Sequence, residues 1–239
     1  MRLSLSLSSL PSLSLLNAET SLPPPSPLPR YGEGFNYEAS SPSYWLLEIS
    51  GVPHGLNGDM LRYAGMTPQH FRGMLFGNAN RWQCALDEPV GGTSADPCPF
   101  DPRAIWSLWK TFEIQRAVMH GFWLTKERAA AAIAYTAPVA IATATSTGGT
   151  APNATLLDAI KLTSFVRLDA KTTLVVVASW ASEPVSLTFK YDWGALGIDA
   201  AKATLRLPKL IPMQPVATSF AAAGKIPLPA LGGFIALLE

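Results

Sequence analysis

The stretch YWLLEISGVPHGLNGDMLRYAGMTPQHFRGMLFGNANRW, residues 44–82, carries most of the information about the fold. It contains two short apolar runs, YWLLEIS and GMLFG, and each ends in a loop rich in Gly, Asn, Asp, His, Arg and aromatic residues. Buried strands that open into polar loops at one face are typical of α/β barrels. The stretch therefore predicts two barrel strands, one at residues 44–51 and one that opens into its loop within residues 72–82, and their loops form one wall of a cleft.

Six polar or aromatic residues around these predicted strands are candidates for a site. Glu33 lies in a predicted loop among aromatic residues, which bind sugars by ring stacking while a carboxylate takes the hydroxyls. Asp59 lies in the loop and short helix predicted for residues 51–66. The plainer alternatives are an exposed loop carboxylate for Glu33 and a salt bridge that fastens the loop for Arg81. The full set is Glu33, Asp59, Arg62, Tyr63, Arg81 and Trp82.

Composition excludes several classes of protein. The chain has 239 residues, of which 48% are apolar and 15% charged, so it can build a sizeable core. A formal net charge of +1 argues against nucleic-acid binding, which needs a basic stripe. Residues 1–30 are Ser-, Leu- and Pro-rich and are predicted to be a leader or linker, with a signal or transit peptide favouring a secreted or organellar protein. No apolar run is long enough to predict a transmembrane helix.

Two cysteines, Cys84 and Cys98, have no metal-binding pattern around them. Their spacing does not fit a zinc knuckle, and the acids between them do not follow a calcium-loop template. We therefore expect no metal and no cofactor. The cysteines are either unrelated thiols or a disulfide, which would require an oxidising compartment.

The second half of the chain changes from helical to strand-like patterns. A helix is predicted from about residue 101 to 120, and residues 126–159 are Ala- and Thr-rich and predicted to be an insertion or linker that contains the glycosylation sequon Asn153-Ala154-Thr155. From residue 160 the apolar period becomes two. Several short strands separated by Pro and Gly follow, and they predict an antiparallel β-sandwich over residues 160–239.

Several motifs together resemble a known family. They are YGEGF-x-Y, YWLLEISG-x-P-x-GL, RGMLFG-x-x-x-RW, IWSLWKTFEI-x-x-A-x-MHGFW, LVVVASWA and DWGALGID. Their order is similar to that in the C-terminal part of the family 123 glycoside hydrolases and their uncharacterised relatives, over residues 31–125 and 160–239. The resemblance implies a (β/α) barrel followed by a terminal β-sandwich, with the Ala/Thr-rich segment as a departure from the pattern.

Length limits how much of a barrel this chain can hold. A complete barrel has eight βα units in about 250 residues, so residues 31–125 have room for about two or three units. The predicted class is therefore α+β: a partial (β/α) barrel over 31–125, then the insertion or linker, then the sandwich.

The resemblance also sets the functional expectation, which is hydrolysis of O-glycosyl bonds in a glycan. In this family the acetamido group of the substrate can replace the nucleophile, while a carboxylate orients it. Glu33 and Asp59 are the residues expected to line the cleft, with Tyr63, Arg62, Arg81 and Trp82 contacting sugar. A partial barrel predicts a fragment or truncated form that is inactive alone. The alternative is a non-catalytic carbohydrate-binding or structural β-sandwich module.

Overall fold

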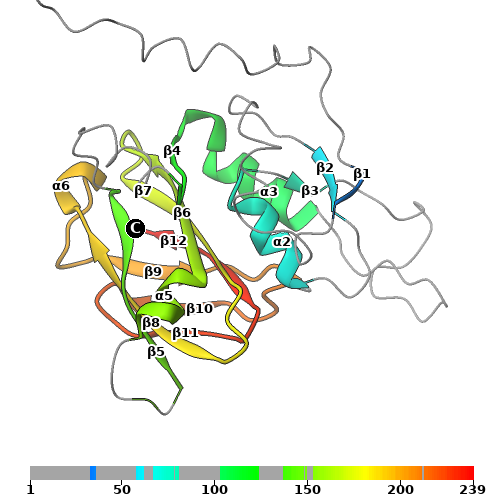
Figure 1. Cartoon of the computed structure of the whole chain (residues 1–239). Helices are drawn as coiled ribbons and strands as arrows, with labels where there is room; N and C mark the ends of the chain where they lie inside the picture. Colours follow the sequence, from blue (N-terminus) through cyan, green and yellow to red (C-terminus); the bar gives the residue numbers. More distant parts are fainter. Residues whose placement is uncertain are drawn as a thin grey trace, which may run out of the picture.

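The computed structural model describes residues 33–35, 58–61, 67–77, 79–80, 103–123, 137–147, 149, 153–211 and 213–239. Within them the chain forms a small parallel sheet, a layer of helices and a two-sheet β-sandwich (Figure 1). The α+β class and the C-terminal sandwich predicted from the sequence are confirmed.

The parallel sheet has three strands in chain order. They are β1 (Glu33–Phe35), β2 (Gly58–Leu61) and β3 (Ala79–Asn80), and both neighbouring pairs are parallel. Helix α2 (Thr67–Met74) connects β2 to β3. Parallel neighbours joined by a helical crossover are the repeating unit of a (β/α) barrel. This part of the structure is consistent with the predicted partial barrel.

The strand predicted at the start of residues 72–82 is wrong. Residues 72–74 form the last turn of α2 and residues 75–77 form a turn, and among the described residues of this range only Ala79–Asn80 is a strand. A short apolar run has no period that separates a buried strand from one buried face of a helix. The strand predicted at 44–51 lies outside the described residues.

The larger sheet of the sandwich is antiparallel and mixes elements from both halves of the chain. Its order is β10 (Thr218–Ala221), β9 (Thr204–Leu207), β12 (Gly233–Leu238), β7 (Thr172–Ser179), β6 (Ile160–Arg167) and β4 (Val118–His120). The smaller sheet is β11 (Ile226–Leu228), β8 (Val185–Tyr191) and β5 (Val139–Ser146), also antiparallel. Strand β5 therefore belongs to the sandwich although it comes from the segment predicted as an insertion or linker.

Four short helices complete the described part of the chain with α2. They are α3 (Arg103–Phe112), the 3₁₀ turn η2 (Ile114–Arg116), α5 (Ala154–Asp158) and α6 (Trp193–Leu196). The helix predicted to run to residue 120 ends at Phe112, because Glu113 takes a left-handed backbone conformation with φ of 54°. Beyond it the chain becomes the edge strand β4, which pairs with β6.

Strand β7 is buried on both faces. Val175 and Val177 lie in the core between the two sheets, while Leu174, Val176 and Ala178 lie in a second core with α2 and α3. Each of these five side chains is fully buried. A sheet covered on both sides explains why the sequence LVVVAS is a continuous apolar run, whereas the one-sided strand β8 alternates.

A charge cluster fastens the end of α3 to the turn between β6 and β7. The buried Arg167 guanidinium donates to the Phe112 carbonyl at 2.8 Å, to Glu113 Oε2 at 2.6 Å and to both carboxylate oxygens of Asp169 at 3.0 and 2.7 Å. Arg116 contacts both acids from the solvent side. The hydrogen bonds from Arg167 lower the pKa of Asp169 to about 2 and also lower the pKa of Glu113.

We expect a substitution at Gly233 to separate α2 from the sheet. A Cβ at this position would lie 2.5 Å from Phe71 Cβ and from the carbonyl oxygen of Val177, which is backbone and cannot yield. Gly233→Ala should lower the free energy of unfolding by about 1–3 kcal/mol, as overpacking does. Urea titration measures it. Gly194→Ala is the matched control, since its Cβ would meet only Asp192 Oδ1 at 3.5 Å; equal effects of the two variants would contradict the packing described.

The Asp169 carboxylate should make stability depend on pH in acid. Its folded pKa of about 2 lies below the ordinary 3.8, so its contribution is complete above pH 3.8 and is lost as the pH falls toward 2. The melting temperature should therefore drop over that window. Asp169→Asn should melt lower than the parent at neutral pH and show a smaller drop in acid.

The exposed Glu183 provides the control for this pH dependence. The melting profile of Glu183→Gln should follow that of the parent. An Asp169→Asn profile parallel to the parent from neutral pH to pH 2 would show that the ionised Asp169 carboxylate does not stabilise the fold.

Candidate functional site

The candidate site lies at the carboxyl edge of the parallel sheet. Because β1, β2 and β3 run in the same direction, their carboxyl ends lie at one edge, and that edge carries the chemistry in barrel folds. In the sequence, Arg62 and Tyr63 follow the last residue of β2 directly, and Arg81 and Trp82 follow the last residue of β3. These four residues lie outside the described part of the chain, so their predicted contacts with sugar stay predictions.

Both candidate carboxylates lie in strands and not in the loops predicted for them. Glu33 is the first residue of β1 and pairs with Met60, while Asp59 is the second residue of β2 and pairs with Asn80. From strand spacing and rise, the Cα atoms of Glu33 and Asp59 are separated by about 6 Å. The strands therefore bring the two backbone positions close together, offset by one residue in register, with each position two residues before the carboxyl end of its strand.

Asn80 is a residue that the sequence reasoning did not select. It is level with Asp59 in the pairing of β2 with β3, and it ends β3 immediately before Arg81 and Trp82. The signal for it was present, since an amide residue at the end of a barrel strand has the same kind of position as the other candidates. A strand placed at the apolar run of residues 74–76 leaves Asn80 in a loop, whereas the structure has the strand at Ala79–Asn80.

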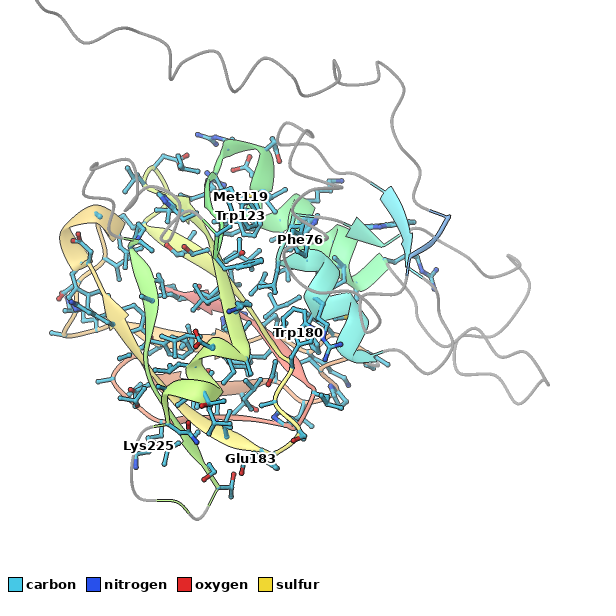
Figure 2. The ribbon with its side chains drawn as sticks, viewed as in Figure 1. Phe76, Met119, Trp123, Trp180, Glu183 and Lys225 are labelled. Atoms are coloured by element: carbon cyan, nitrogen blue, oxygen red, sulfur yellow. The ribbon has the colours of Figure 1, made fainter. Side chains whose placement is uncertain are left out.

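Helix α2 connects this edge to the sandwich. It packs against β7 and β12 on one side and against β2 and β3 on the other. The buried Arg72 donates from Nη2 to the Ser179 carbonyl at 2.9 Å, and its guanidinium lies 4.6 Å from the centre of the Trp180 ring. Figure 2 shows Trp180 beside α2 on the side of the sandwich. The position of the parallel strands is thus linked to the large antiparallel sheet through α2, and α3 also contacts β3.

The carboxyl end of α2 is held by a threonine of the sandwich. Thr163 Oγ1 donates to the Leu75 carbonyl at 2.7 Å and accepts a hydrogen bond from the Phe122 amide at 3.4 Å. The last carbonyls of a helix have no partner within the helix, so a buried one needs such a donor. Thr163 therefore fixes where the turn into β3 begins.

An aromatic cluster surrounds the same end of the helix, away from the candidate site. Phe76 stacks on Trp123 with ring centres 5.8 Å apart (Figure 2). Phe122 meets Trp123 edge-on at 5.1 Å. Since α2 begins beyond the carboxyl end of β2 and ends before the amino end of β3, this cluster lies toward the amino edge of the parallel sheet. That face of a barrel serves stability, so we assign these rings to packing.

The titratable groups of the described sandwich and helices form no second catalytic or metal-binding site. Glu113 and Asp169 are engaged by Arg167, and a carboxyl with a lowered pKa is not a general acid at neutral pH. Burial raises the pKa of Tyr191, whose hydroxyl donates to the Ala222 carbonyl at 3.0 Å. Within the residues the structure describes, no group of His, Cys, Asp or Glu is arranged to hold a metal ion. Cys84 and Cys98 lie outside those residues.

Fold and site together define the class: an α+β protein with strands of a (β/α) barrel beside an antiparallel β-sandwich. Comparison with family models gives two matches, to the TIM-barrel domain of glycoside hydrolase 123 over residues 28–83 and to the C-terminal domain of glycoside hydrolase 123 over residues 148–239. Over these two ranges the chain is similar to the glycoside hydrolase 123 family. No curated protein and no solved structure matches it.

The candidate residues fall in one of the two matched ranges, and most of the sandwich falls in the other. All six sequence-derived candidates and Asn80 fall within the match to the TIM-barrel domain. Helix α5 and strands β6 to β12 fall within the match to the C-terminal domain, whereas α3, β4 and β5 lie between the two. Among the described helices, none has the length and apolar character needed to cross a membrane.

Replacing Thr163 should loosen α2 while an equally buried threonine nearby tolerates the same change. Thr163→Val leaves the Leu75 carbonyl without this donor and should cost about 1–3 kcal/mol in the free energy of unfolding. Thr173→Val should be neutral or stabilising, because Thr173 is fully buried and its Oγ1 has no hydrogen-bond partner among the described residues. Denaturant titration compares the two variants, and an equal loss in both would contradict the role given to Thr163.

Proposed function

We propose that this glycoside hydrolase-related chain binds a glycan that carries N-acetylhexosamine, at the carboxyl edge of the parallel sheet. Glu33 and Asp59, each two residues before the last residue of its strand, are the carboxylates of this cleft. Tyr63, Arg62, Arg81 and Trp82 contact the sugar. The observation that supports this most is the sequential parallel order β1-β2-β3, since it brings the ends of all three strands to one edge.

The chemistry of these residue types suits a pyranose. Trp82 and Tyr63 offer rings for its apolar faces, and arginines and carboxylates offer hydrogen-bond partners for its hydroxyls. A substrate acetamido group can act as the internal nucleophile, as the resemblance implies. One of the two carboxylates then orients it while the other protonates the leaving oxygen.

The same proposal predicts that this chain alone hydrolyses glycosides slowly or not at all. The described residues provide three parallel strands, whereas a closed barrel has eight. A glycosidase requires two carboxyl groups held at a defined separation, and an open partial barrel provides few walls to hold the substrate between them. We therefore expect binding to exceed hydrolysis.

The binding test uses the full chain with immobilised glycans and with aryl N-acetylhexosaminides. Trp82→Ala and Arg81→Ala should each weaken glycan binding about tenfold, which is about 1.4 kcal/mol. Glu183→Gln, at an exposed position of the sandwich, is the control that should bind like the parent. Binding that is unchanged in the Trp82 and Arg81 variants would place the glycan elsewhere.

The turnover test separates a complete site from a binding remnant. If the chain hydrolyses an aryl N-acetylhexosaminide, Glu33→Gln and Asp59→Asn should each reduce kcat far more than KM, because they remove groups used in the transition state. Turnover that survives both changes would remove these carboxylates from the mechanism. Neither binding nor turnover by a folded chain would contradict the proposal as a whole.

The second candidate is a carbohydrate-binding or structural module in which the sandwich alone carries the function. It is favoured by the aromatic pair at the end of β8, where the half-buried rings of Tyr191 and Trp193 stack 4.5 Å apart. A Trp193→Ala variant separates the two. It should leave glycan binding unchanged if the cleft is the site and abolish it if the sandwich is.

A further inference from the structure

Asn153 has the sequence motif, the surface exposure and the local hydrogen bonds that suit a covalent modification of its side chain. The chain has six asparagines, and only Asn153-Ala154-Thr155 satisfies the pattern of Asn followed by any residue but Pro and then Ser or Thr. All three residues are exposed on the surface of the sandwich. This motif has no part in the packing of the cores or in the proposed glycan-binding edge.

The Asn153 side chain caps helix α5 through its amide oxygen and not through its amide nitrogen. Its Oδ1 accepts hydrogen bonds from the Thr155 amide at 2.9 Å and from the Leu156 amide at 3.4 Å. The backbone amide of Asn153 donates to the Ala144 carbonyl at 2.9 Å, which ties the residue to β5. The helix cap therefore engages Oδ1, whereas Nδ2 takes no part in it.

We propose that Asn153 is a site of N-linked glycosylation, with a lipid pyrophosphate-linked oligosaccharide as the donor. The amide Nδ2 forms a bond to C1 of the reducing-end sugar and loses one proton. The bond between C1 and the pyrophosphate oxygen breaks, and the lipid pyrophosphate leaves. No oxidation or reduction takes place. The product is still an amide, so Oδ1 keeps its two hydrogen bonds and the start of α5 is unchanged.

The location is compatible with the rest of the molecule. Helix α5 lies over β5 and β6, and Figure 1 places it on the part of the sandwich away from β1, β2 and β3. A bulky hydrophilic chain there would cover neither the candidate cleft nor the contact of α2 with β7. This inference is independent of the proposed function, because it concerns what the chain carries and not what it binds.

The variants separate loss of the glycan from loss of the helix cap. Asn153→Asp keeps an acceptor oxygen for the Thr155 and Leu156 amides but has no amide nitrogen. Thr155→Ala keeps the backbone amide that donates to Asn153 but destroys the sequon. Thr155→Ser keeps the backbone amide and the sequon. All three should remain folded, which melting curves of the purified chains check.

The experiment sends the full chain into the secretory pathway of a eukaryotic cell with a cleavable leader. Peptide N-glycosidase should shift most of the secreted parent and the Thr155→Ser variant to one faster band, and digestion in ¹⁸O-water should convert Asn153 to labelled Asp. Asn153→Asp and Thr155→Ala should show no shift. A folded, secreted parent with unmodified Asn153, or a shift that persists in Asn153→Asp, would overturn the proposal.

Discussion

The contact between α2 and the large antiparallel sheet is the constraint on which the other features depend. Phe71 lies directly over Gly233 of β12, at a distance that leaves no room for a side chain there. Around this contact, buried side chains of β7 and β12 meet those of α2 and α3 in a single apolar cluster. Burial of this kind is worth about 25 cal/mol per Å² of apolar surface, so the cluster is a major part of what orders the helices. Two polar anchors, Arg72 and Thr163, then set the position of α2 along the sheet.

That contact also explains how the sandwich differs from the one expected from sequence. Two sheets that pack only on each other alternate apolar and polar residues along each strand. Here β8 does so, but β7 does not, because its outer face supports the helices. The Arg167 cluster closes the edge of the same interface at the end of α3. The helix layer is therefore held by apolar packing at its centre and by paired charges at its rim.

The features that can be predicted from the sequence are those whose pattern lies in adjacent residues. The hairpin of β6 and β7 is predictable because two strand-forming runs flank a short turn at Asp169–Lys171, and every part of that signal is adjacent in the chain. The run of residues 74–76 resembles a strand because three apolar residues fit either state, and its packing against β7 belongs instead to the end of helix α2 and the turn that follows. The strands of Glu33 and Asp59 have three and four residues, too short for any period to appear. Their register across the parallel sheet, which brings Asn80 level with Asp59, depends on pairing between distant segments.

A helix shared by two sheets has a consequence for how such proteins are rearranged over evolution. The family models divide the chain into a barrel domain and a C-terminal domain, but α2 belongs to the first by sequence and packs into the core of the second. A gene fusion that transferred only the sandwich would leave Leu174, Val176, Ile235 and Leu237 facing water. An exchanged unit that keeps these side chains covered must therefore include the sandwich together with its helix layer, so its boundary would have to lie on the amino side of α2.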